Sequence, residues 1–382
     1  NANVKNGQII TETNNYSDQW VGGPTRSGVI GIDKNKNLRI EAMEYRGWLS
    51  SEKWGDWRAE IIQCNRFGRR NEMVMFNSYY PKNKPFPIIE WGNDINDYRL
   101  VEGENTEVYL DLEDGQKWAI GKDFTAIVKE IKTNTSGGVL GDYDLCLTAN
   151  GDNYLPKVNQ LAVGDKVTLN FGWRSFEKND IPEFENVVGG NAIVLKNGEL
   201  TDRNFGDDYN DKVYSRSAYG MSEDGKTLYM FVIDLSQDPV YGRSSGCTTS
   251  VMCQIMKQLG AYTVCNVDAG GSAQLMVQGK VVNRTTESTP RAVANGWMVY
   301  SIAPNDDKSN VITRIEFLDP EIKLPIYTTY KPVILGYNVY GELISENVEG
   351  ITMECDAAIG TANGDKVDVG GTECTATVTA KY

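Results

Sequence analysis

A tight turn between two apolar segments constrains this chain more than any other stretch. The apolar run Tyr262–Cys265 leads into Asn266-Val267-Asp268-Ala269-Gly270-Gly271-Ser272, and a second apolar run follows from Ala273 to Val277. Adjacent glycines allow backbone angles that other residues resist, and they let a ligand approach the main chain closely. An aspartate in such a turn is held in place and accessible. The segment therefore predicts either a functional site or an ordinary hairpin whose aspartate caps the turn.

Composition narrows the classes of function. The 382 residues are 40% hydrophobic and 24% charged, as in a soluble globular protein of two or three domains. The net charge of −14 argues against a nucleic-acid-binding protein, and no apolar run is long enough to span a membrane. The chain contains no histidine, which excludes Ser-His-Asp catalysis and histidine-ligated metals. Acid–base chemistry must then come from Asp, Glu, Tyr, Lys or Cys.

The chain ends and the cysteines constrain the function less than the composition does. The first residues do not form a signal peptide, and the missing initiator methionine is what a processed, mature chain would show. The seven cysteines contain no CxxC spacing, which argues against a zinc knuckle. Cys355 and Cys374 are candidates for a disulfide within a short terminal segment.

The patterns predict an α+β fold, with a strand-rich domain over residues 1–303 that has few helices. Apolar spacing predicts one clear helix over 248–259, with Thr248 or Thr249 as N-cap and Gly260 after its end. The loop 241–247 before it would present free N–H groups to a phosphate, or would simply start a helix. After a polar linker, short alternating runs over 310–382 predict a small all-β, Ig-like sandwich, which either binds carbohydrate, acts as a spacer or is purely structural.

Several other segments combine glycine, arginine or a carboxylate with a strand end, as the opening turn does. In chain order these are Val188-Gly189-Gly190-Asn191, Arg216-Ser217-Ala218-Tyr219-Gly220, Val232-Ile233-Asp234, Ser245-Gly246-Cys247-Thr248, Val281-Val282-Asn283-Arg284 and Arg291-Ala292-Val293-Ala294-Asn295. With the opening turn, these motifs resemble the phosphodiester glycosidase family, which includes the animal enzyme that uncovers mannose 6-phosphate. The match is dense over 185–300 and looser before it. Departures are Ala269 and Asn191, each in place of a family glycine, and Leu235 after Asp234.

The resemblance implies a hydrolase that cleaves a sugar-1-phosphodiester at its glycosidic bond in a cell-surface or host glycan. Glycoside cleavage generally needs two carboxylates, and we expect Asp268 as nucleophile or general base with Asp234 as its partner. Either Arg216 or Arg291 would bind the phosphate in a bidentate manner. The remaining substrate-binding candidates are the backbone N–H groups at Gly270, Gly271 and the Thr248 helix start, and the side chains of Ser272, Asn266 and Asn295.

Three of these candidate residues also have an alternative, purely structural role. Asp234 would cap a turn, Arg216 would pair with a surface acid, and Asn295 would satisfy buried backbone. We expect no cofactor, although a divalent cation bridging Asp234 and Asp268 is an alternative. Alternative functions are a non-catalytic carbohydrate-binding protein of the same fold, to which Ala269 points, and a phosphodiesterase that attacks phosphorus. The expected location is secreted, periplasmic or at the cell surface, with a glycan or sugar phosphate as the bound partner.

Overall fold

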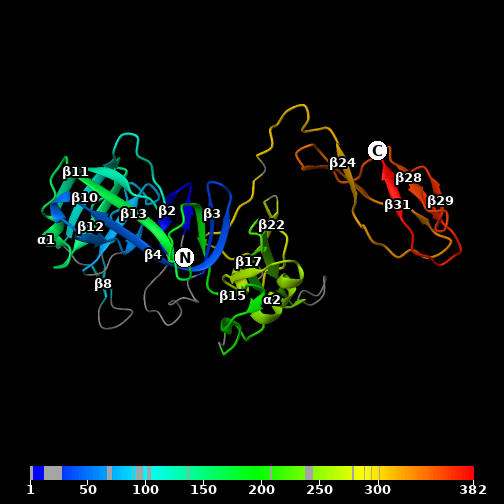
Figure 1. Ribbon diagram of the computed structural model, residues 1–382, viewed down its shortest axis with the longest axis horizontal. Coiled ribbons are helices and arrows are strands. Elements are labelled where there is room, and N and C mark those ends of the chain that lie inside the picture. Colours follow the sequence, from blue (N-terminus) through cyan, green and yellow to red (C-terminus); the bar gives the residue numbers. More distant parts are fainter. Residues whose placement is uncertain are drawn as a thin grey trace. The chain divides into compact units, whose positions relative to one another are not determined.

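The protein is described from a computed structural model that covers residues 3–12, 28–66, 71–87, 89–91, 98–100, 105–135, 137–206, 209–236, 244–277, 279–287, 289–293, 295–300 and 302–382. The chain forms two compact units, residues 1–297 and residues 298–382. Strands account for 42% of the structure and helices for 7%, which confirms the predicted strand-rich α+β class (Figure 1). None of the helices in the described ranges is long and apolar enough to cross a membrane.

The first unit is built on a large, mostly antiparallel sheet. In the described residues its strands run in the order β2 (Gln8–Thr11), β1 (Asn3–Lys5), β14 (Phe184–Gly189), β3 (Gly28–Asp33), β4 (Leu38–Ser50), β13 (Lys166–Ser175), β11 (Phe124–Thr135), β10 (Asn105–Leu112), β12 (Leu145–Asn150), β7 (Met73–Asn77) and β6 (Gln63–Cys64), with β5 (Arg58–Glu60) paired to β4. The short helix α1 (Leu155–Val158) follows β12. The short apolar runs at 29–32 and 38–40, separated by the polar residues 33–37, predict a hairpin, and the structure confirms it as the antiparallel pair β3–β4.

A second, five-stranded sheet of the first unit contains most of the motifs. Its order is β16 (Glu199–Leu200), β15 (Ile193–Lys196), β21 (Thr263–Asn266), β17 (Arg216–Met221) and β18 (Leu228–Ile233), and every pairing is antiparallel. The predicted helix is confirmed as α2 (Thr249–Gln258), with Thr248 as its N-cap. Three small hairpin pairs complete the unit: β8 (Ile89–Trp91) with β9 (Tyr98–Leu100), β19 (Leu235–Ser236) with β20 (Ser244–Ser245), and β22 (Met276–Val277) with β23 (Lys280–Val281).

The apolar run before Asn266 is continuous because strand β21 is buried on both faces. Val264 packs with Met252 and Met256 of α2 on one face. Cys265, one residue along, points to the other face and packs with Ile30 and Ile40 of strands β3 and β4. Helix α2, the five-stranded sheet and the β3–β4 hairpin are therefore three packed layers.

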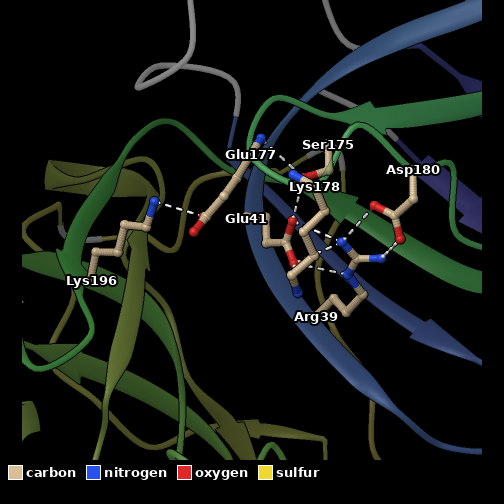
Figure 2. A network of polar contacts seen from close by, with 7 residues as sticks. All are labelled: Arg39, Glu41, Ser175, Glu177, Lys178, Asp180 and Lys196. Atoms are coloured by element: carbon tan, nitrogen blue, oxygen red, sulfur yellow. Dashed lines mark hydrogen bonds and ion pairs between the residues drawn. The ribbon is translucent and has the colours of Figure 1, made fainter.

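A polar network lies beside this apolar contact (Figure 2). Arg39 of β4 binds both Glu41 and Asp180, and Ser175 and Lys178 also donate to Glu41. Lys196 at the end of β15 reaches Glu177 at 2.7 Å. Since both side chains of this last pair are about half exposed, it contributes less than ~1 kcal/mol. The apolar layer holds the two sheets together.

The predicted hairpin across the Asn266–Ser272 turn is wrong as a pairing of its two flanking segments. Strand β21 pairs with β15 and β17, whereas the apolar run after the turn forms β22 and pairs with β23. The turn instead leads out of the sheet through a short 3-10 helix over Gly270–Ser272. The acid therefore lies at a sheet end, where several loops can meet it.

The second unit contains only short strands in its described part. They are β24 (Arg314–Phe317), β25 (Thr329–Tyr330), β26 (Ile334–Tyr337), β27 (Leu343–Ser345), β28 (Thr352–Cys355), β29 (Gly360–Asn363), β30 (Lys366–Val369) and β31 (Val378–Lys381). They surround a small core of Ile334, Val348, Ile351, Met353 and Val367. Cys355 and Cys374 are separate thiols, so the suggested disulfide is not formed. The Ig-like assignment and the limits 1–303 and 310–382 stay predictions.

We predict that Gly190→Ala destabilises the first unit by about 1–3 kcal/mol, the usual cost of overpacking a core. A Cβ at Gly190 would lie 2.3 Å from the buried Cys265 Sγ and 3.2 Å from the Asn266 carbonyl oxygen. Urea unfolding measures the change. Gly296→Ala is the control because a Cβ there meets no atom within 4 Å, and equal stability of the two variants would contradict this packing.

Candidate active site

One end of the five-stranded sheet gathers the predicted motifs. Strand β21 ends at Asn266, opposite Ala218 near the start of β17, and β18 ends at Ile233, opposite Arg216. Strand β15 starts at the same edge, since Ile193 is opposite Cys265. The antiparallel pairing therefore places the segments around residues 190, 215, 234 and 268 at the same end of the strands of this sheet.

Asn266, at the end of β21, is buried and forms hydrogen bonds with several segments at this end of the sheet. Its Oδ1 accepts the Ala192 N–H at 2.9 Å, and its Nδ2 donates to Asn210 Oδ1 at 3.2 Å. Its backbone also exchanges hydrogen bonds with Asn191 and Ala192. Asn266 was predicted to orient substrate hydroxyls, and that role stays a prediction; the contacts present tie three loops together.

Arg216 is buried too, with 1% of its surface exposed. Its Nη2 donates to the carbonyl oxygens of Tyr209 at 2.6 Å and Lys212 at 2.5 Å, and its Nε donates to Cys247 O at 3.2 Å. The rings of Tyr209 and Tyr214 lie 5.1 and 5.2 Å from the guanidinium carbon. These contacts fix the loop before β17, and the pairing of Arg216 with an acid stays a prediction. Phosphate binding by Arg216 stays a prediction.

Asp268 is exposed at the turn that follows β21. Its Oδ1 accepts the N–H of Ala269 at 2.9 Å. Ala269 has φ −124° and ψ −171°, an extended conformation open to any residue, whereas Gly270 has φ +64°. The left-handed position in the turn thus keeps its glycine, and the alanine that replaces a family glycine introduces no backbone strain.

Ser215, the residue before strand β17, forms two hydrogen bonds with Gly270 of the glycine turn. The Gly270 N–H donates to the Ser215 carbonyl oxygen at 3.1 Å, and Ser215 Oγ donates to Gly270 O at 2.7 Å. Ser215 Oγ also lies 2.9 Å from Thr286 Oγ1. The Gly270 N–H, predicted to bind anions, is therefore engaged within the protein.

Asp234 follows β18 and is half-buried. Its two carboxylate oxygens accept Asn283 Nδ2 at 3.0 Å and the Arg284 N–H at 2.9 Å. Asn283 also binds the chain just after the glycine turn, by donating to Ala273 O and accepting the Leu275 N–H. The Val-Val-Asn-Arg motif thus joins the Asp234 strand end to the segment that carries Asp268.

This arrangement suits a carboxylate held by N–H donors better than a cation ligand. In the described residues no group of three or more His, Cys, Asp or Glu side chains is arranged to hold a metal ion. The bridging cation considered for Asp234 and Asp268 stays an alternative.

Arg291 lies beside the glycine turn, on the surface. It forms a bidentate ion pair with Glu287, four residues earlier, and its Nη1 donates to Ser272 Oγ at 3.4 Å. The hydrogen bond that Arg291 donates to Glu287 is the main cause of the raised pKa of Arg291, and the charge of Asp268 adds to the rise. Arg291 thus contacts Ser272, in the turn that also carries Asp268.

The other two candidates are less informative. Thr248 caps α2 by accepting the Val251 N–H, as the sequence predicted. Asn295 is half-buried, two residues before Trp297, whose N–H donates to the Tyr219 hydroxyl. Residues 241–243 of the loop before α2, and Ala294 of the last motif, lie outside the described residues.

Sequence reasoning missed two residues. Glu287 is an isolated acid in a polar loop, and only the fold brings it to Gly271, where an added Cβ would lie 2.6 Å from its Oε1. Tyr209 places its hydroxyl 3.5 Å from Val267 O, next to Asp268. Burial raises the pKa of Tyr209 to about 12, with a further contribution from the charge of Asp268. No local pattern marks either residue.

Comparison with known proteins relates the segment that contains the candidate site to a known family. Residues 123–300 match the sequence model of the phosphodiester glycosidase family. The resemblance seen in the sequence is confirmed over this segment. It includes strands β11 to β23 and every predicted site residue. No curated protein sequence gives a significant match.

Solved structures resemble this chain at low sequence identity. A hypothetical protein from Synechocystis is 17% identical with a TM-score of 0.45, covering 75% of this chain and 45% of its own. A putative exported protein from Burkholderia pseudomallei is 15% identical with a TM-score of 0.52, covering 75% and 58%. The zebrafish N-acetylglucosamine-1-phosphodiester alpha-N-acetylglucosaminidase catalytic domain, auto-inhibited by its pro-peptide, is 14% identical with a TM-score of 0.23, covering 75% and 86%.

This chain therefore spans about half the length of the first two solved chains. At these identities the Burkholderia protein supports a shared fold alone.

We predict that Arg216→Lys lowers the free energy of unfolding by about 2–4 kcal/mol, because a lysine keeps the charge but cannot serve the same carbonyls in a fork. Urea unfolding measures the loss. Arg291→Lys is the matched control, since the exposed Arg291 should change stability by less than about 0.5 kcal/mol. Equal stability of Arg216→Lys and the native chain would contradict the structural role of Arg216.

A second prediction concerns pH. Because the folded pKa of Tyr209 is about 12, its unfolded form ionises first as pH rises above about 10, and stability falls through this window. Between pH 9 and 11 the native protein should lose about 1 kcal/mol more than Tyr209→Phe. Denaturant unfolding at both pH values tests this, with Tyr214→Phe reporting the effect of losing the neighbouring phenol. An identical loss in native protein and Tyr209→Phe would contradict the burial of this phenol.

Proposed function

We propose that the first unit hydrolyses the glycosidic bond of a sugar-1-phosphodiester. The observation that carries the proposal is the contact of Arg291 with Ser272 in the glycine turn that also carries Asp268, within the segment that matches the phosphodiester glycosidases. A carboxylate beside a guanidinium offers one group for the anomeric carbon and one for the phosphate.

In the proposed reaction the Asp268 carboxylate acts at the anomeric carbon, directly or by activating water. The bond between that carbon and the phosphate oxygen breaks, and the phosphate leaves as a monoester. Since phosphate is a good leaving group, little help from a general acid is needed. Arg291 would neutralise the departing charge, while Asp234 is the second carboxylate and holds the Asn283–Arg284 segment in place.

The proposal extends to a cell-surface or host glycan as substrate, and to a secreted, periplasmic or cell-surface location. The non-catalytic alternative was based on Ala269. The unstrained, extended backbone at Ala269 and the retained left-handed Gly270 support a turn that accommodates alanine at this position without backbone strain. A hydrolase is therefore favoured over a binding protein of the same fold.

The test uses a panel of hexose and N-acetylhexosamine 1-(methyl phosphates) in ¹⁸O-labelled water. We expect the label in the released sugar, because C–O cleavage transfers the water oxygen to the anomeric carbon. Label in methyl phosphate would instead show attack on phosphorus, and would overturn the proposal in favour of a phosphodiesterase. Lack of hydrolysis across the panel would also count against it.

We predict that Asp268→Asn lowers kcat/KM by about a thousandfold or more, within the range for loss of a catalytic carboxylate. The variant should keep its unfolding midpoint, because Asp268 is exposed and its Oδ1 accepts the adjacent Ala269 N–H, as an amide oxygen can also do. Asp224→Asn in the exposed β17–β18 turn is the control and should keep full activity. Unchanged turnover in Asp268→Asn would refute the assigned role.

A further inference from the structure

The ion pair between Arg291 and Glu287 occupies the guanidinium fork that a phosphate would use. Arg291 Nε and Nη2 both donate to the Glu287 carboxylate, and both side chains are about half exposed. Planar guanidinium binds carboxylate and phosphate with the same bidentate geometry. In this structure a carboxylate of the protein therefore stands where an anionic ligand of Arg291 would bind.

The glycine turn allows this approach. Glu287 Oε1 and Arg291 Nη2 would lie 2.6 and 2.7 Å from a Cβ at Gly271, so any side chain there would push the pair away. Arg291 also reaches Ser272 Oγ in the same turn. Glu287 is thus fixed beside the residues proposed to meet the substrate, although its own negative charge opposes an anionic ligand.

We propose that Glu287 is a specificity-determining residue that favours phosphodiesters over phosphate monoesters at Arg291. This inference rests on the proposed function. A diester carries one negative charge, whereas a monoester carries nearly two at neutral pH and above. Because Coulomb repulsion is proportional to the ligand charge, the Glu287 carboxylate disfavours the dianion more than the monoanion. The same repulsion would expel the monoester product.

The charges around this position are mixed. Asp268 adds a second negative charge near Arg291, and Arg291 supplies the attraction that both carboxylates weaken. Asp268 acts on every substrate as the proposed catalytic group, whereas Glu287 forms an ion pair with Arg291. Replacement of Glu287 by glutamine removes the charge and keeps a side chain of the same shape.

The experiment measures binding, without turnover, of dimethyl phosphate and methyl phosphate by calorimetric titration at pH 8. Glu287→Gln should tighten binding of dimethyl phosphate by about threefold and of methyl phosphate by about tenfold, since the effect multiplies with each charge. Both effects should shrink in 0.5 M NaCl because salt screens exposed charges. Glu199→Gln is the matched control: it removes the same charge from β16, where Glu199 pairs with Lys257 at 3.5 Å.

Three results would overturn the inference: an equal change for both ligands, an equal change in the Glu199→Gln control, or no binding of either ligand at millimolar concentration. Because no turnover is involved, the outcome separates this inference from the proposed function. The predicted binding difference without hydrolysis of any sugar phosphodiester would keep the Glu287 role and reject the glycosidase. Hydrolysis with equal ligand changes would do the reverse.

Discussion

The candidate site depends on how the buried guanidinium of Arg216 is satisfied. A buried charge needs donors and acceptors around it, or its desolvation is too costly. Here the acceptors are main-chain carbonyls from the loop before β17 and from Cys247 before α2. The same side chain thereby joins a loop, a strand and a helix start, and it places Tyr209 beside Asp268. Arg216, one of the two arginines expected to bind phosphate, is buried in this structure and contacts three segments around the candidate site.

Near Arg216, the side-chain amides of asparagine residues form hydrogen bonds that hold the loops against the sheet. Asn266 ties the start of β15 to Asn210, and Asn210 Oδ1 also accepts the Thr249 hydroxyl at the start of α2. On the other side, Asn283 joins Asp234 to the chain after the glycine turn. Each amide has donors and acceptors enough to bind two segments at once, so loops that are distant in sequence are fixed relative to each other.

In the exposed part of the site, charge and hydrogen bonding matter more than burial. Asp268, Arg291 and Glu287 lie at the surface, where hydrogen-bonding geometry and small charge differences decide binding rather than burial. A rigid buried layer beneath a charged surface cluster is a suitable arrangement for an enzyme that must accept an anionic group and then release a more highly charged product.

Local patterns in the sequence determined the elements that carry the site: the α2 helix with its Thr248 cap, the β3–β4 hairpin, the apolar run of β21 and the glycine turn after it. These depend on interactions between residues near in sequence, so apolar spacing and cap residues are enough to predict them. The motif order also indicated the resemblance to the phosphodiester glycosidases, which is confirmed over residues 123–300, and it made Asp268 and Asp234 the candidate catalytic residues. Tertiary structure alone decided that Arg216 is buried while Arg291 is exposed, and that β21 pairs with β15 and β17 rather than across its own turn. It also decided that Tyr209 lies next to Asp268 and that Glu287 pairs with Arg291 at the glycine turn. Those outcomes depend on which distant strands pair and which charges are desolvated, and an arginine or a glutamate has the same local signature in either environment.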